Sequence, residues 1–348
     1  MRHTENTFIA YARKILGIAG EAAGRMALKA IMKGGSDRCF YRLTVGDDKS
    51  FLFMAYGRQQ EENSYWVDIA AFLAALGVPV PAVYGHDREL GFVLMEDLGD
   101  RDLWSYRHEP WEVRRGLYRK VLQRISPLHT FAECSPSKGK DGPPANIAAS
   151  LPRIMKGYDR ELYRWEHDYF LEQFVRDVCR INLTELEGAA LGEELAALTG
   201  RLLGAGKALV HRDLQSQNIM ICGGGPVFID FQGLRRGSLF YDLGSLLCDP
   251  YVPLTAEERD ELLRYAHELL PLDLDWTPFR EGFLDGSAQR LMQALGAFGF
   301  LGLKKGKEAF LGHIPQGIEN LCRMAAASGR LPELLKLAER CNGVRLTY

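Results

Sequence analysis

Residues 209–220, with the sequence Leu-Val-His-Arg-Asp-Leu-Gln-Ser-Gln-Asn-Ile-Met, constrain the fold of this chain more than any other stretch. Two short apolar segments around a Gly-Gly-Gly-Pro turn follow, and this pattern predicts a β-hairpin over 219–229. Asp213 and Asn218 precede the hairpin strands, and Asp230 lies at the far end. Two carboxylates and an amide therefore converge on one point. Such oxygen ligands suit Mg2+ held together with substrate phosphates.

The spacing of these residues, His-x-Asp-x-x-x-x-Asn followed by the Asp of the next hairpin, resembles the catalytic loop of kinases. In a phosphotransferase Asp213 would accept the proton of the acceptor hydroxyl, and Asn218 and Asp230 would hold metal against the nucleotide phosphates. His211 is predicted to be structural. The alternative is an ordinary loop with Asp230 capping a strand, but four residue types and two spacings would then agree by chance.

Composition and charge argue against several other classes of protein. The 348 residues carry 43 Lys and Arg against 45 Asp and Glu, and the net charge of −2 disfavours a general nucleic-acid binder. No apolar run approaches the roughly 20 residues of a membrane helix, and the N-terminus has no secretory segment. The 7 cysteines are odd in number and widely spaced, which argues against disulfides or zinc. We therefore expect a cytoplasmic protein with no membrane or nucleic-acid partner and no evident protein partner.

The first quarter of the chain has the pattern of a small sheet with two helices. Helices are predicted at 4–17 and 59–76, and strands at 26–32, 39–45, 50–56, 83–86 and 91–95. After residue 96 the composition changes abruptly, as expected of a hinge. The predicted fold is α+β and bilobal, like that of protein kinases. A small N-lobe over 1–96 carries a five-stranded antiparallel sheet, and a larger helical C-lobe spans 97–348.

Two segments of the N-lobe are predicted to bind the nucleotide, which is ATP in a kinase. The turn between the first two strands contains Gly34, Gly35 and Ser36, and glycines let backbone N–H groups approach a phosphate closely. The alternative is an ordinary hairpin turn. In a kinase-like fold the hinge backbone would bond the adenine edge, at Met95, Glu96 and Leu98.

Beyond the hinge, apolar residues recur at helical spacing. Helices are predicted at 111–130, 153–181, 191–202, 255–269, 278–296, 304–311, 314–327 and 332–341. Asp242 opens a further short helix, where a carboxylate satisfies N–H groups, and we expect it to brace the catalytic loop. Only eleven residues (231–241) separate Asp230 from Asp242. A polypeptide acceptor needs a longer activation segment ending in Ala-Pro-Glu, so the acceptor is predicted to be a small molecule.

Together these motifs resemble the aminoglycoside phosphotransferase and choline kinase superfamily. Within it, the chain resembles the bacterial sugar kinases that act on the anomeric hydroxyl of N-acetylmuramate and N-acetylglucosamine. The matching stretches span nearly the whole chain: 35–42, 78–81, 91–100, 209–220, 229–232, 241–251 and 295–315. The resemblance implies phosphoryl transfer from ATP, with Mg2+, to a sugar hydroxyl.

The third strand departs from the pattern of most kinase-like folds, which place a phosphate-binding lysine there. Residues 51–56 contain Met54 and no lysine. The sugar-kinase branch that the chain resembles also has an apolar residue at this place. We hypothesise that Arg38, in the glycine turn, supplies the missing positive charge. The alternative is a surface arginine paired with solvent.

The catalytic loop also departs from the sugar-kinase branch. Gln215 and Gln217 replace a His and an Arg, so two potentially charged groups beside the base are absent. This difference favours a neutral acceptor, because a carboxylate would need another cation. The candidates for that cation are Arg235, Arg236 and Arg290. The residues predicted to contact the sugar are Gln215, Gln232, Asp249 and Arg290.

The predicted function is transfer of the ATP γ-phosphoryl group to a small-molecule sugar acceptor, at its anomeric hydroxyl. One alternative is a kinase for an aminoglycoside, choline or another sugar. A cationic acceptor would require a cleft rich in Asp and Glu. The other alternative is a nucleotide-binding pseudokinase with a regulatory role, which the missing lysine motivates. The presence of Asp213, Asn218 and Asp230 argues against it.

Overall fold

The computed structural model describes residues 5–19, 25–31, 38–46, 49–57, 59–131 and 151–344. Gly34, Gly35 and Ser36 of the predicted phosphate turn lie outside these residues. Within the described ranges, no helix is long and apolar enough to cross a membrane.

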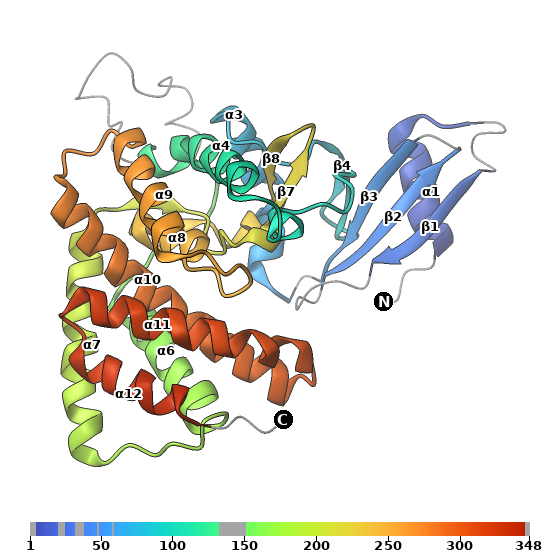
Figure 1. Ribbon diagram of the computed structural model, residues 1–348. Coiled ribbons are helices and arrows are strands. Elements are labelled where there is room, and N and C mark those ends of the chain that lie inside the picture. The colour runs from blue at the N-terminus through green and yellow to red at the C-terminus, as the bar shows by residue number, and fades with distance from the viewer. Residues whose placement is uncertain are drawn as a thin grey trace.

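Five antiparallel strands form the N-terminal sheet, at the right of the molecule in Figure 1. The strand order is β1-β2-β3-β5-β4. The bounds are β1 (Met26–Ile31), β2 (Cys39–Val45), β3 (Lys49–Ala55), β4 (Val83–Asp87) and β5 (Phe92–Glu96). The predicted five-stranded sheet is therefore confirmed, with each strand shifted by at most one residue at either end.

The two faces of this sheet pack against different parts of the chain, because neighbouring strand residues point to opposite sides. Phe53 packs on Phe8 of α1 (Glu5–Leu16), with ring centroids 4.8 Å apart. Met54, the next residue, joins the core on the other face with α3 (Trp66–Ala75). The side chain at the place where most kinase-like folds carry a lysine is thus fully buried among apolar groups.

The remainder is largely helical and is organised around α10 (Trp276–Gly299), which packs against α8, α11 and α6 (Figure 1). Small residues allow these close approaches. A Cβ at Gly286, for example, would overlap the carbonyl oxygen of Phe240 in α8. The other helices are α4 (Trp111–Thr130), α6 (Arg160–Phe170), α7 (Glu185–Gly204), α8 (Leu239–Leu247), α9 (Ala256–Leu269), α11 (Ile314–Ser328) and α12 (Pro332–Asn342).

Two short antiparallel strand pairs hold the catalytic loop between them. The predicted hairpin is observed as β7 (Ile219–Cys222) and β8 (Gly225–Phe228). Its turn is only Gly223 and Gly224, both with positive φ, so it is two residues shorter than the predicted four-residue turn. The pair β6 (Ala208–Val210) and β9 (Arg235–Gly237) was not predicted, because three-residue strands show no periodic pattern.

Three predicted helices, at 59–76, 153–181 and 304–311, differ from the observed ones. Tertiary contacts explain the largest difference, which is at 153–181. Residues 151–159 are extended, because their main chain bonds to that of β9 and the residue before it. The Met155 N–H donates to the Leu234 carbonyl (3.1 Å), and the Tyr158 N–H to the Arg236 carbonyl (2.8 Å). The remaining differences are segments wound more tightly or more widely than an α-helix. Two are 3₁₀ turns, at Glu61–Tyr65 and Glu308–His313, and two are π-helical, at Leu171–Arg176 and Phe300–Lys304.

Candidate active site

Asp242, in the first turn of α8, anchors the start of the catalytic loop. Its carboxylate accepts hydrogen bonds from the main-chain N–H groups of His211 (2.7 Å) and Arg212 (2.8 Å). His129 of α4 contacts the same carboxylate at 2.9 Å, and both side chains are buried. Arg212 has a φ of 80°, a conformation that costs on the order of 1–3 kcal/mol for a residue other than glycine. The two bonds to Asp242 hold this turn and thereby position Asp213.

The His211 ring ties the loop to the far end of the hairpin. Its Nε2 lies 3.0 Å from the carbonyl oxygen of Ile229, so this nitrogen carries the proton and donates. Its Nδ1 is buried and has no hydrogen-bond partner among the described residues. The next residue after Ile229 is Asp230, so His211 fixes the distance between the two candidate catalytic carboxylates. The side chain is thus placed for a structural role.

Asp213 sits at the surface of the loop with its side chain 30% exposed. Its Oδ1 accepts a hydrogen bond from Nη2 of Arg290 at 3.2 Å. Burial by itself would raise the pKa of Asp213, but the charges of Arg212 and Arg290 lower it below its usual value. The carboxylate is therefore ionised at neutral pH. It can accept a hydrogen bond from a hydroxyl and orient it for attack.

Asp230 and Asn218 provide oxygen atoms that suit a divalent cation. Asp230 adopts a left-handed backbone conformation (φ 63°) directly after the hairpin. Its Oδ1 accepts from Arg38 and from Gln232 Nε2 (3.0 Å), while its Oδ2 accepts from no described residue. The Asn218 amide nitrogen donates to the Asp213 carbonyl (3.0 Å), which leaves its oxygen for a ligand. Two protein oxygens of this kind fit Mg2+, which completes its coordination with water and phosphates.

The metal would depend on the nucleotide for its remaining ligands. Across the described ranges, no group of three or more His, Cys, Asp or Glu side chains could hold a metal ion alone. This arrangement is typical of phosphoryl-transfer sites, where metal and nucleotide bind together.

Arg38 connects the N-terminal sheet to the loop after the hairpin. It forms an ion pair with Asp230 and donates through Nη1 to Gln232 Oε1 at 2.7 Å. Its side chain is only 6% exposed, so it is not a surface arginine. Gln232 meets Arg38 and Asp230. The structure therefore places Gln232 beside Arg38 and Asp230, the residues predicted to lie at the phosphates and the metal.

The hinge is held by a fork of charge-assisted hydrogen bonds. Arg42 of β2 contacts both oxygens of Asp97 (2.7 and 3.1 Å) and both oxygens of Asp100 (3.0 and 2.9 Å). The Glu96 N–H donates to the Ala82 carbonyl at 2.8 Å, which ties the hinge to the approach to β4. The three residues predicted to meet the adenine edge lie in this segment: Met95, Glu96 and Leu98.

Arg290 reaches the catalytic loop from α10. Its guanidinium donates to Asp213, to Gln215 Oε1 (3.4 Å), to Ser245 Oγ (3.2 Å) and to Gln293 Oε1. The side chain is 7% exposed. The structure thus brings Gln215 and Arg290 together at Asp213. Arg290 is engaged by protein groups on all three of its nitrogens, and this reduces its capacity to bind a carboxylate of the acceptor.

Asp249 does not lie where a sugar contact requires it. It is 1% exposed, and its oxygens accept the main-chain N–H groups of Ser216 (2.7 Å) and Tyr251 (3.0 Å). Burial raises its pKa. The structure makes Asp249 a brace of the catalytic loop, comparable with Asp242.

Sequence patterns did not reveal a buried polar network beneath the loop. Glu166 of α6 is fully buried and accepts hydrogen bonds from Tyr158 (3.2 Å), Tyr241 (3.1 Å) and Gln289 (3.0 Å). The segment around it is rich in aromatic residues, which is the pattern of an apolar core. The sign of this network in the sequence is Glu166 itself, a carboxylate within an aromatic segment. His129 gave a similar signal, as a histidine near the end of an otherwise apolar helix face.

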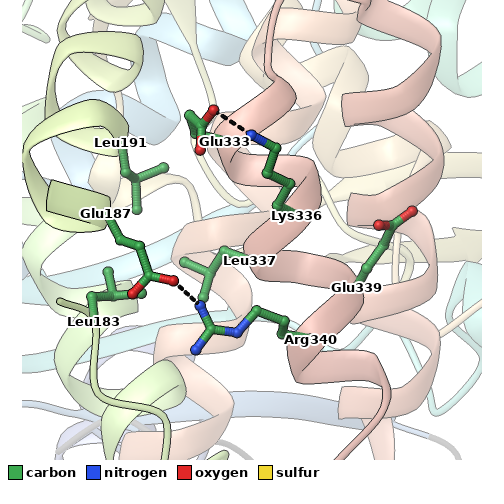
Figure 2. Close-up of a pocket in the computed structure, with 8 residues that line it drawn as sticks. All are labelled: Leu183, Glu187, Leu191, Glu333, Lys336, Leu337, Glu339 and Arg340. Carbon is green, nitrogen blue, oxygen red and sulfur yellow. Dashed lines mark hydrogen bonds and ion pairs between the residues drawn. The ribbon is translucent and has the colours of Figure 1, made fainter.

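A separate hollow of about 670 Å³ lies between α7 and α12 (Figure 2). Its walls carry two ion pairs, between Glu187 and Arg340 (2.6 Å) and between Glu333 and Lys336 (2.7 Å). None of the eight residues drawn in Figure 2 belongs to the catalytic loop or the hinge. The hollow therefore has no part in the candidate active site.

A family model and a related protein each match most of this chain. The family model described as "Phosphotransferase enzyme family" matches residues 27–281. The N-acetylmuramate/N-acetylglucosamine kinase of Pseudomonas aeruginosa is 27% identical over 329 residues, which cover 92% of this chain and 90% of that protein.

Solved structures match more than nine-tenths of the chain at low identity and therefore establish the fold. A choline/ethanolamine kinase family protein from Mesorhizobium loti superposes with a TM-score of 0.58 at 16% identity, covering 96% of this chain and 99% of that one. An ADP-bound aminoglycoside phosphotransferase gives 0.55 at 14% identity, with 92% and 99% covered. The predicted α+β fold, with its five-stranded sheet and helical remainder, is thus confirmed.

Proposed function

The chain belongs to the phosphotransferase enzyme family, and on this premise we propose that it transfers the γ-phosphoryl group of ATP to a hydroxyl of an N-acetylated amino sugar. The observation that carries the proposal is an ionised Asp213 whose main-chain carbonyl accepts from the Asn218 side chain, while the Asn218 main-chain carbonyl accepts from Ile229, the residue before Asp230. The acceptor class rests on the likeness to N-acetylmuramate/N-acetylglucosamine kinases over nearly the full length of both chains. The anomeric hydroxyl is the proposed point of attack.

In this proposal the two parts of the chain have separate tasks. Residues 1–96 and the hinge bind the nucleotide, with Arg38 beside the phosphates. Asn218 and Asp230 would hold Mg2+, which would neutralise phosphate charge. Residues 97–348 bind the sugar. Asp213 accepts the hydrogen bond of the acceptor hydroxyl, directs its oxygen at the γ-phosphorus and takes the proton as the new O–P bond forms. The bond between the γ-phosphorus and its bridging oxygen breaks, and that oxygen leaves with ADP.

An acceptor panel tests this function. The protein is incubated with ATP, Mg2+ and one of N-acetylglucosamine, N-acetylmuramate, glucose, choline or an aminoglycoside, and ADP release is measured. We expect release with the N-acetylated sugars, and a 31P NMR signal coupled to the anomeric proton of the product. Release with choline or an aminoglycoside alone would contradict the proposed acceptor class. Absence of release with every acceptor would contradict the kinase activity.

A further inference from the structure

A smaller hollow, of about 170 Å³, opens beside the strand pair β6 and β9. Its wall includes the last turn of α7, the residues between α7 and β6, the end of β9 and part of the extended segment 151–159. None of the residues assigned above to the base, the metal or the hinge lines it, and neither does Arg38. The hollow is therefore separate from the candidate active site.

Two cationic side chains line this hollow, and no carboxylate does. Lys207 precedes β6, Arg236 lies in β9, and both are exposed. Because Ala208 pairs with Gly237 and side chains alternate along a strand, the residues next to this pair share the other face. Those that line the hollow are Lys207, Arg236 and Ser238. Neither cation forms a side-chain hydrogen bond or an ion pair with any residue that the structure describes, so both charges are available to a ligand.

Two buried hydroxyl groups also line the hollow. Ser238 is 1% exposed and Tyr163 is fully buried, and neither hydroxyl has a hydrogen-bond partner within the described ranges. Ser238 directly precedes α8, yet its side chain does not cap that helix. Burial raises the pKa of Tyr163, and the charge of Glu166 raises it further, so the phenol keeps its proton and can donate. Buried hydroxyl groups are nearly always hydrogen-bonded, so these two indicate a polar ligand in the hollow.

We propose that this hollow binds a phosphoryl group, held by the cations of Lys207 and Arg236 and by the hydroxyls of Ser238 and Tyr163. A phosphoryl group carries about two negative charges at neutral pH, and its oxygens are strong hydrogen-bond acceptors. Two cations match that charge, and the four side chains are all donors toward it. A cationic ligand would find no carboxylate in the wall.

The proposed phosphoryl site adjoins both segments that position the catalytic loop. β6 ends at Val210, and the loop begins at the next residue. Ser238 directly precedes α8, which carries Asp242, the residue that anchors the loop. A ligand that contacts Lys207 and Arg236 together joins the start of β6 to β9. Binding to the folded protein alone also stabilises it, so the site links a small anion to the rigidity of this region.

Calorimetric titration with potassium phosphate at constant ionic strength tests the site. Lys207→Gln and Arg236→Gln change exposed side chains, so both variants should fold, and each is expected to raise the Kd for phosphate about 10-fold. Arg160→Gln is the matched control, because Arg160 is exposed and lines neither hollow, and it should change the Kd by about twofold or less. Ser238→Ala and Tyr163→Phe each remove one hydroxyl and should raise the Kd by about fivefold.

A second titration, with glucose 1-phosphate, distinguishes the source of the phosphoryl group. If both ligands bind and both are weakened in Arg236→Gln, the site takes phosphomonoesters; if only inorganic phosphate behaves so, it takes the free anion. Either result supports the site. An unchanged Kd in both Lys207→Gln and Arg236→Gln would place the bound phosphate elsewhere and overturn the proposal, as would absence of binding by the unmodified protein. The titrations need neither nucleotide nor acceptor, so their outcome is independent of the proposed function.

Discussion

The candidate site contains two aspartate–arginine pairs, and they differ in how much freedom they leave the carboxylate. Asp230 pairs with Arg38, which enters from the N-terminal sheet, and one of its oxygens accepts from no described residue. Asp213 pairs with Arg290, which stands on the central helix α10 and bonds three further side chains. In the proposed function, the first pair leaves one carboxylate oxygen for a metal ion held with the nucleotide phosphates. In the second pair, Arg290 holds the Asp213 carboxylate in one orientation. A residue that orients an acceptor hydroxyl needs such a fixed position.

The largest expected effect comes from removing the charge of the base. Asp213→Asn keeps the size of the side chain but cannot accept a proton. We expect turnover to fall roughly 10²–10⁴-fold while nucleotide affinity is retained. ADP release under saturating ATP and sugar measures the effect. Turnover within a few-fold of the unmodified protein would remove Asp213 from its assigned role.

Arg38→Ala tests the pair of Asp230 and Arg38, which is proposed to lie at the nucleotide phosphates. Loss of a charged hydrogen-bond donor to the phosphates is expected to raise the KM for ATP by about 10- to 100-fold, with a much smaller effect on the KM for the sugar. Arg13→Ala, on the N-terminal helix, is the matched control for removal of one arginine from the same part of the chain. If the KM for ATP does not change in Arg38→Ala, the arginine does not replace the missing lysine.

Arg290→Gln tests whether the second pair controls ionisation. The pKa of Asp213 is lowered because the charges of Arg212 and Arg290 outweigh burial, which alone would raise it. Without the charge of Arg290, less opposes the effect of burial, so the pKa of Asp213 rises. Asp213 is then protonated at a higher pH than in the unmodified protein. The acidic limb of the kcat–pH profile should therefore move to higher pH. Arg290→Lys should keep the limb in place. A lower kcat with an unmoved limb would mean that Arg290 acts by packing alone.

The smallest expected effect concerns the hinge fork. Arg42→Ala should lower the free energy of unfolding by about 1 kcal/mol, because the pair with Asp97 is largely buried. Arg88→Ala removes an exposed pair with Asp68 and should have almost no effect. Urea unfolding measures both. The Asp97 pKa is lowered in the folded protein, so the Arg42 effect should be present above the usual carboxyl pKa and fade as pH falls below it. Equal losses in both variants would contradict this account.

Local patterns predicted the sheet and the hairpin after residue 218 well, for a physical reason. Alternating apolar residues and glycine turns are local features, and they determine strands that are neighbours in the sequence. Asp213, Asn218 and Asp230 likewise lie on one loop and one hairpin, within 18 residues of sequence. The two arginine partners had no such local signal. Arg38 and Asp230 are 192 residues apart, and Arg290 and Asp213 are 77 apart.

The errors have the same origin in tertiary contacts. Asp249 is predicted from the sequence to contact the sugar, but it is 1% exposed. Its carboxylate instead satisfies main-chain groups of the loop, a role that depends on packing between distant segments. The extended course of 151–159 depends likewise on hydrogen bonds to 234–236. Such contacts leave no periodicity in the sequence.

Calorimetric titration of Mg2+–ADP into Asp213→Asn and Asp230→Asn tests the division between the two pairs most directly. The two variants make the same chemical change at the two carboxylates, and the measurement needs no knowledge of the acceptor. The account predicts that Asp213→Asn binds the nucleotide as the unmodified protein does, while Asp230→Asn loses most of the affinity. Equal affinities in the two variants, or a loss confined to Asp213→Asn, would contradict it.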